Sequence, residues 1–177
     1  MIFMSPQTNI PNPNEKATVV EPSFVTKLFA SALFSGYSPI ASGTVGSMVA
    51  LAFYFIPGFE SLLIISTSIL IVFILGIKTA NTMEQRYGHD PAEVTIDEVV
   101  GMWISLFLLP KKIFIVIAAF FVFRFFDIFK PFPARKFDNM HGGFGIMMDD
   151  VIAGIYSNII IQLALLIPMV KEFLLKQ

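Results

Sequence analysis

The chain carries no charged residue from Ser61 to Ile77, and most side chains in this stretch are apolar. A run of roughly 17 apolar residues is the shortest that crosses the hydrocarbon core of a bilayer as a helix. A second uncharged run, from Val151 to Val170, is also long enough, although Asn158, Gln162 and Pro168 interrupt it. The chain is 55% hydrophobic and 14% charged, whereas soluble domains contain about 25% charged residues. The sequence therefore predicts a membrane protein.

The remaining apolar segments are too short to cross a bilayer comfortably. They are predicted as helices, and they comprise Phe24–Phe34, Val45–Ile56, the segment that starts at Ile96, and Ile113–Phe126. We expect an all-α fold: a compact helical membrane protein with about two full transmembrane helices plus shorter interfacial or re-entrant helices. Residues 1–22 are rich in proline and polar residues, which predicts a flexible N-terminal tail before a single domain over 23–177.

Two features of the composition exclude function classes. The formal net charge is −1, so the basic face that nucleic-acid binding requires is not expected. The chain has no cysteine, which excludes disulfides, thiolate metal ligands and a cysteine nucleophile.

The charged residues are concentrated in a few places, above all between Arg124 and Asp150. Two acid pairs, Asp97-Glu98 and Asp149-Asp150, are each followed about one turn later by a glycine, and each pair is expected to start a helix. A small residue lets a second helix approach closely, so two such helices side by side would bring four carboxylates together. Asp127 would add a fifth. Helix capping and an intrahelical pair between Asp127 and Arg124 are the structural alternatives.

Carboxylates gathered at a low-dielectric boundary repel one another and require neutralisation. Oxygen ligands are those that Mg²⁺ prefers, and nearby cations suit a phosphate group. We therefore predict a Mg²⁺ and phosphate site. The predicted metal ligands and catalytic residues are Asp97, Glu98, Asp127, Asp149 and Asp150. The predicted phosphate-binding residues are Lys130, Arg124, Thr44, Arg135 and His141.

Three details extend this prediction. The segment Gly142-Gly143-Phe144-Gly145 is expected to form a loop that closes over a ligand. Thr44 and Ser47 are candidate caps of the helix after a Gly/Ser-rich loop, where backbone N–H groups can meet an anion, with an ordinary helix-entry loop as the structural alternative. His141 is a candidate proton donor to a leaving alcohol, with a hydrogen-bonded structural histidine as the alternative.

Four ordered blocks of this chain resemble the phosphatidylglycerophosphatase A family. They are Ser38–Ser47, Asp97–Trp103, Phe123–Pro131 and His141–Gly154. The resemblance extends from about Gly36 to Gly154. One departure is Ser42, where the family usually has proline before Gly43-Thr44.

The resemblance implies an all-α, Mg²⁺-dependent lipid phosphatase of the bacterial inner membrane. Such an enzyme hydrolyses the phosphate monoester of phosphatidylglycerophosphate to phosphatidylglycerol and inorganic phosphate, a step in phospholipid and cardiolipin precursor biosynthesis. The active site is expected to face the cytoplasm, where the family's substrate is made. The identity of the general base, the number of metal ions, the oligomeric state and the choice between water attack and a phospho-aspartate route stay open at this stage.

Two other function classes fit the residue pattern less well. A CDP-alcohol phosphatidyltransferase also uses membrane-embedded aspartates with a divalent metal, but its pattern needs an Asp-Gly step, which is absent here. An ion channel or transporter predicts acids spaced through the apolar spans, whereas these acids cluster at segment ends.

Overall fold

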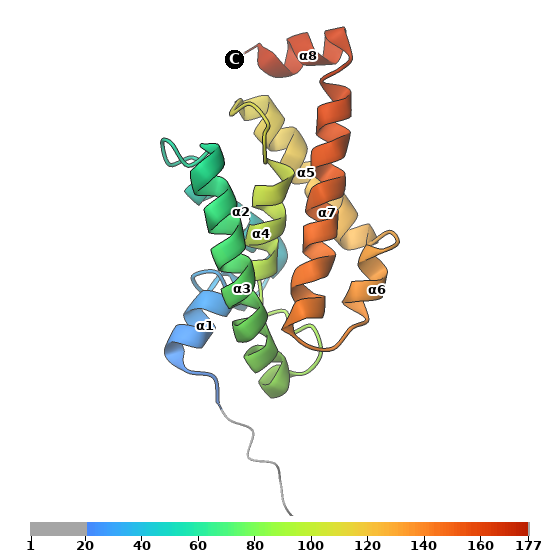
Figure 1. The fold of residues 1–177 in the computed structure, drawn as a ribbon. Helices are drawn as coiled ribbons and strands as arrows, with labels where there is room; N and C mark the ends of the chain where they lie inside the picture. The colour runs from blue at the N-terminus through green and yellow to red at the C-terminus, as the bar shows by residue number, and fades with distance from the viewer. Residues whose placement is uncertain (1–20, 177) are drawn as a thin grey trace, which may run out of the picture.

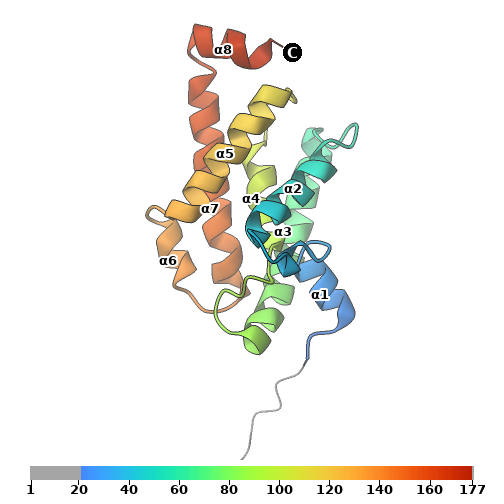
Figure 2. The same cartoon turned by 180° about the vertical axis from the view of Figure 1, so that it is seen from behind.

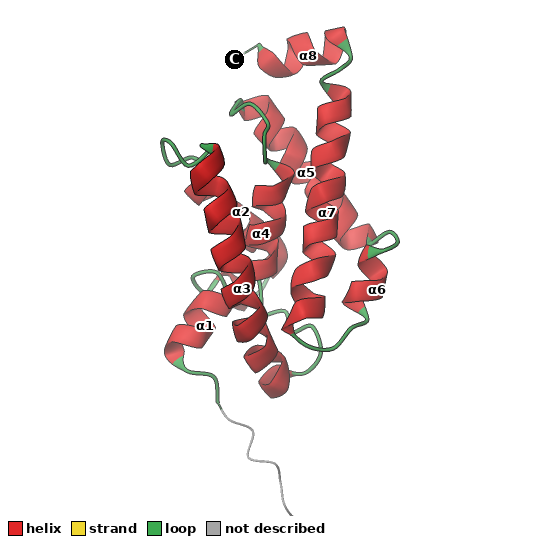
Figure 3. Ribbon diagram, in the orientation of Figure 1, coloured by secondary structure: helices red, strands yellow, loops and turns green. Residues whose placement is uncertain are grey.

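The computed structural model describes residues 21–176, and this part of the chain contains helices and no strand (Figure 3). The all-α prediction is confirmed. The predicted tail over residues 1–22 lies almost entirely outside the described residues. The helices are α1 (Phe24–Ala30), the short 3-10 helix η1 (Ser35–Tyr37), α2 (Ser42–Tyr54), α3 (Leu62–Tyr87), α4 (Ile96–Ser105), α5 (Ile113–Phe129), α6 (Ala134–Asp138), α7 (Gly143–Ala164) and α8 (Pro168–Leu175).

Helix α4 lies at the centre of the molecule (Figure 1). Every residue of α4 except Ile104 is buried, because α2, α3, α5 and α7 all pack against it. Helix α7 also contacts α3, α5 and α6, and the view from behind shows α5 alongside it (Figure 2). The short helix α8 lies across the far end of the molecule from α1 (Figure 1). The core is therefore built around the α4–α7 pair.

Two helices are long and apolar enough to span a membrane, as predicted: α3 with 26 residues and α7 with 22. They differ in burial, because only 11% of the most apolar window of α3 is buried inside the molecule, against 56% for α7. The apolar side chains of α3 thus face outwards, where a bilayer would cover them. Helix α7 combines a spanning length with a core position.

The bounds of these two helices differ from those of the apolar runs. The apolar run continues into the polar segment after Lys78 as one helix, because a single lysine does not interrupt helical hydrogen bonding, and α3 ends at Tyr87 with Gly88 as its C-cap. The predicted span to Val170 divides in two, because Pro168 lacks an N–H group and starts a new helix, α8. Asn158 is accommodated inside α7 because its amide donates to the carbonyl oxygens of Ser105 and Phe107.

The region around α1 and α2 also departs from expectation. The first helix ends at Ala30 rather than Phe34, because the backbone at Ala32, Leu33 and Phe34 is left-handed. Helix α2 begins at Ser42 with no side-chain cap, so the prediction that Thr44 or Ser47 caps it is wrong. Both residues lie inside the first two turns of α2 instead.

Candidate active site

The contact between α4 and α7 brings the two acid pairs together, as the glycine pattern predicts. A Cβ atom on Gly101 would lie 2.7 Å from the carbonyl oxygen of Asp150, and one on Gly154 would overlap the carbonyl oxygen of Gly101. The two backbones therefore touch at these glycines. Because Asp97-Glu98 and Asp149-Asp150 lie about one turn before them, all four carboxylates face the same region.

The structure corrects two predictions about the second acid pair. Asp149 and Asp150 do not start a helix, since α7 already begins at Gly143. The glycine cluster does not close over a ligand as a loop, because Gly143 and Gly145 are helical. Their missing side chains allow close packing instead: a Cβ atom on Gly143 would overlap the carbonyl oxygen of Ile77 in α3.

Three of the five predicted acids converge on one point. One carboxylate oxygen each from Glu98, Asp127 and Asp150 lies within 4.8 Å of the others. The guanidinium Nη1 of Arg124 lies 2.5 Å from both oxygens of Glu98 and 2.9 Å from Oδ2 of Asp127. The intrahelical pair considered for Arg124 and Asp127 therefore exists, and it also bridges to α4. The hydroxyl of Ser47 lies 3.1 Å from Oε2 of Glu98.

The other two acids lie in the same cavity. Asp97 and Asp149 hold equivalent positions, because Oδ1 of each accepts the backbone N–H of the next residue, at 2.9 and 3.0 Å. The cavity has a volume of about 220 Å³. It is lined by Ser42, Gly43, Asp90, Pro91, Ala92, Val94, Asp97, Glu98, Asp127, Lys130, Asp149 and Asp150. All five predicted acids and Lys130 thus share one polar cavity.

Lys130 supplies the cation of this cavity. Its ammonium group lies 2.6 Å from Oδ2 of Asp149, forms a second ion pair with Asp138, and lies 3.9 Å from Oδ2 of Asp90. Lys130 caps the end of α5 in a left-handed conformation, with φ of 43°. Neither Asp90 nor Asp138 was predicted as a site residue, since each is an isolated acid in a loop or a short helix and only the fold brings it to Lys130.

Burial shifts the ionisation of these groups. Desolvation, together with the charge of Asp127, raises the pKa of Glu98 to about 7, although Arg124 opposes the shift. Desolvation and the neighbouring Glu98 charge raise the pKa of Asp97 well above its usual range. Burial alone would lower the pKa of Lys130, but the nearby Asp149 and Asp138 outweigh it and raise that pKa. The cavity therefore holds more acid than its own cations neutralise.

The other predicted phosphate-binding residues lie outside the lining of this cavity. Thr44 is half-buried in α2. Arg135 lines a neighbouring hollow with Lys130, Phe129 and Phe132. His141 is 82% exposed and lies beside Glu84.

Comparison with known proteins decides the family. The sequence profile of phosphatidylglycerophosphatase A matches residues 28–165. Two relatives bear that name: one from Escherichia coli, 39% identical over 73% of this chain and 77% of its own, and one from Haemophilus influenzae, 37% identical over 85% and 93%. The chain belongs to the phosphatidylglycerophosphatase A family.

The family assignment covers every residue of the polar cavity, because residues 42–150 lie inside the matched region. It confirms the prediction of an enzyme of the lipid phosphatase class. A further relative, from Bacteroides thetaiotaomicron, has the provisional name phosphatidylinositol-3-phosphatase and is 44% identical over 81% of this chain and 95% of its own. No solved structure matches the chain significantly.

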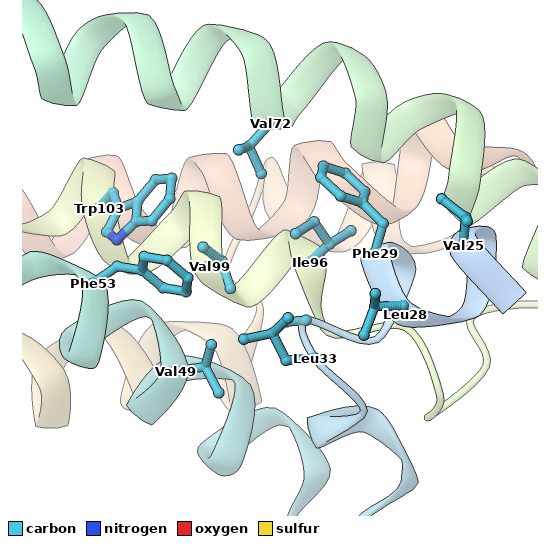
Figure 4. Close-up of a pocket in the computed structure, with 11 residues that line it drawn as sticks. Val25, Leu28, Phe29, Leu33, Val49, Phe53, Val72, Ile96, Val99 and Trp103 are labelled. Carbon is cyan, nitrogen blue, oxygen red and sulfur yellow. The ribbon is translucent and has the colours of Figure 1, made fainter.

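A second, apolar cavity lies between α1, α2, α3 and α4 (Figure 4). It has a volume of about 270 Å³, and helices α1, α2, α3 and α4 all contribute to its wall. Its lining is Val25, Leu28, Phe29, Ala32, Leu33, Val49, Phe53, Val72, Ile96, Val99 and Trp103. Ile96 and Val99 directly flank Asp97 and Glu98 in the chain, so the apolar and polar cavities share the first turn of α4.

Proposed function

We propose that this protein hydrolyses the phosphate monoester of phosphatidylglycerophosphate, with Mg²⁺, to phosphatidylglycerol and inorganic phosphate. The observation that carries the proposal is the convergence of Glu98, Asp127 and Asp150 beside Lys130 in one cavity. Carboxylates for a hard cation next to an ammonium group for an anion are the components that phosphoryl transfer requires.

The residues present fit Mg²⁺. The converging donors are all carboxylate oxygens, which Mg²⁺ prefers, and Oδ2 of Asp150 is buried with no hydrogen-bond partner among the described residues. Glu98, Asp127 and Asp150 would hold the ion. When bound, Mg²⁺ supplies electrostatic stabilisation to the phosphate oxygens as charge develops on them.

The protein's own groups take distinct roles in this proposal. Lys130 binds a phosphate oxygen, and its raised pKa keeps it charged. Arg124 positions Glu98 and Asp127 through its two ion pairs. Asp97 accepts a proton from the attacking water, because Oδ1 is engaged by the Glu98 N–H and Oδ2 remains available. Asp149 suits this role less, since Lys130 neutralises it.

The proposed reaction replaces one bond to phosphorus by another. A water oxygen forms a bond to phosphorus, and the bond from phosphorus to the glycerol oxygen breaks. Asp97 takes a proton from this water, the leaving glycerol oxygen takes up a proton from solvent, and Asp97 then releases its own proton to solvent. The products are a lipid alcohol and inorganic phosphate, and the enzyme carboxylates are unchanged overall.

The apolar surroundings suit a lipid substrate. Ile96 and Val99 line the apolar cavity on one face of the first turn of α4, and Asp97 and Glu98 line the polar cavity on the other face. An acyl chain in the apolar cavity would therefore reach a head group in the polar cavity around this turn of the helix. The outward apolar face of α3 suits a position in a bilayer. We propose the bacterial inner membrane, with the polar cavity on the cytoplasmic side where the substrate is made.

The name of the Bacteroides relative supports a second candidate substrate, phosphatidylinositol 3-phosphate. Both lipids are phosphate monoesters, so the same carboxylates and lysine would serve either. The head group differs, because inositol is a larger group than glycerol.

Phosphate release from purified protein in detergent micelles tests the proposal. Both lipids are offered separately, with EDTA and then with Mg²⁺ added back. We expect release from phosphatidylglycerophosphate that stops with EDTA and returns with Mg²⁺. Release from phosphatidylinositol 3-phosphate alone would reassign the substrate, and activity that withstands EDTA would contradict the metal site.

A further inference from the structure

A second group of metal-ligating side chains lies outside the polar cavity. Glu84 belongs to the last turn of α3, His89 to the loop that follows, and His141 to the segment just before α7. One ligand atom from each lies within 4.8 Å of the others. These are the two histidines of the whole sequence, and we call the three residues the histidine cluster.

Both imidazole rings face one carboxylate oxygen. Oε1 of Glu84 lies 2.9 Å from Nδ1 of His89 and 3.4 Å from Nδ1 of His141. The other oxygen, Oε2, accepts the backbone N–H of Gly142 at 2.5 Å, which fixes the orientation of the carboxylate. The ring centroids of the two histidines lie 4.5 Å apart. Three potential ligands therefore point towards one small volume.

The hydrogen bonding of His89 makes its Nδ1 atom a suitable ligand. Its Nε2 lies 2.9 Å from the carbonyl oxygen of Asp138, which can only accept, so Nε2 carries a hydrogen. A neutral ring then directs the lone pair of Nδ1 towards Oε1 of Glu84. A bound metal ion would take the place of the proton that otherwise joins these two atoms in an ion pair. Metal-bound histidines characteristically donate their other N–H to a carbonyl or carboxylate in this way.

The spacing suits a small tetrahedral ion. Zn²⁺ binds histidine nitrogen and carboxylate oxygen at about 2.0–2.2 Å, so neighbouring ligands of a tetrahedral site lie about 3.3–3.6 Å apart. The 3.4 Å separation between His141 and Glu84 lies in this range, and the 2.9 Å separation between His89 and Glu84 would lengthen by about 0.4 Å when an ion binds. The exposed side chain of His141 leaves room for water as the fourth ligand.

We propose that Glu84, His89 and His141 form a separate binding site for Zn²⁺ or a similar imidazole-preferring divalent ion. Imidazole selects such ions, whereas the all-oxygen polar cavity suits Mg²⁺. The ion joins the end of α3, the following loop and the start of α7. It also holds Asp138, which binds His89 through its carbonyl and Lys130 through its carboxylate. The ion would therefore fix the position of Lys130 at the edge of the polar cavity through Asp138.

Titration of metal-free, tag-free protein with Co²⁺ tests this proposal, with excess Mg²⁺ present to occupy oxygen sites. We expect one equivalent to bind with the visible spectrum of a tetrahedral, imidazole-ligated ion, and Zn²⁺ to displace it. His89→Ala and His141→Ala should each weaken binding by about tenfold or more. Asp150→Asn, in the polar cavity, is the matched control and should bind Co²⁺ as the wild type does.

Thermal unfolding provides an independent readout. Zn²⁺ should raise the melting temperature of the wild type, because an ion that binds only the folded state stabilises it, and should not raise that of His141→Ala. The exposed ring of His141 makes this variant safe for folding. The proposal is overturned by absence of saturable Co²⁺ binding, by unchanged binding in both histidine variants, or by loss of binding in Asp150→Asn.

Discussion

The ammonium group of Lys130, the C-cap of α5, lies 2.6 Å from Oδ2 of Asp149 in α7. This ion pair joins the end of α5 to the second turn of α7 across the polar cavity. It keeps one of the five acids neutralised and places a fixed positive charge at the cavity wall. A phosphate that enters the cavity meets this charge directly.

Lys130→Asn tests this role. Asparagine tolerates the left-handed backbone at this position, so the change removes the charge without straining the end of α5. A hydrogen bond to a charged group contributes about 1.5–3 kcal/mol, so kcat/KM should fall roughly 10- to 100-fold. Lys136→Asn, a nearby exposed lysine outside the polar cavity, is the matched control. An unchanged kcat/KM for Lys130→Asn would contradict phosphate binding by Lys130 and leave it the role of an interfacial anchor.

Neutralising the converging acids should stop the reaction. Asp127→Asn and Asp150→Asn keep the side-chain shape but remove a charged ligand, and Asp97→Asn removes the proposed base. Each should lower kcat at least about 100-fold, which corresponds to about 2.7 kcal/mol. Phosphate release measures the loss, and circular dichroism should show the same helix content. Glu172→Gln, an exposed acid in α8, should behave as the wild type. Near-normal activity in all three aspartate variants would refute the site.

Gly101→Ala should destabilise the protein, because the added Cβ atom would lie 2.6 Å from Cε2 of buried Phe123 and 2.7 Å from the backbone of Asp150. Forcing such contacts apart costs about 1–3 kcal/mol. Thermal unfolding in detergent measures the effect, and activity should fall with it as Asp150 moves. In Gly76→Ala the new atom meets mainly the flexible end of Met147, so this control should be close to neutral. Equal melting temperatures for the two variants would contradict close α4–α7 packing.

A larger side chain in the apolar cavity should raise KM for a substrate with long acyl chains but not for one with short chains. Val49→Phe places a ring in the space proposed for an acyl chain. Excluding two methylene groups forfeits about 1.6 kcal/mol, so KM for long-chain substrate should rise roughly tenfold. KM for a short-chain analogue should not change. Ile71→Phe, on the exposed face of α3, is the control. Equal effects on both substrates would show that no chain occupies this cavity.

Much of the architecture is local information and is therefore readable from the residues. The lengths of the apolar runs predicted both spanning helices. Gly88 is the C-cap of α3, and its φ of 100° is a backbone conformation that favours glycine. The paired acids and their glycines predicted that α4 and α7 would meet. The errors arose at boundaries: Pro168 started a helix, and Gly143 began α7 before the acids.

The contacts of isolated residues were not predictable in the same way. Asp90 and Asp138 reach Lys130, and Glu84 joins two histidines, only because the fold brings the end of α3, the loop after it, α6 and the start of α7 together. Nothing near these residues in the chain signals that convergence.

The sequence alone determined that this chain forms apolar helices and that five acids and a lysine accompany them, because helix formation and membrane burial depend on neighbouring residues. The tertiary structure decided that Glu98, Asp127 and Asp150 share one point while Asp149 pairs with Lys130. That choice depends on ångström-scale distances between helices. The touching backbones at Gly101 and Gly154 set those distances, and a pattern of residues along the chain does not contain them.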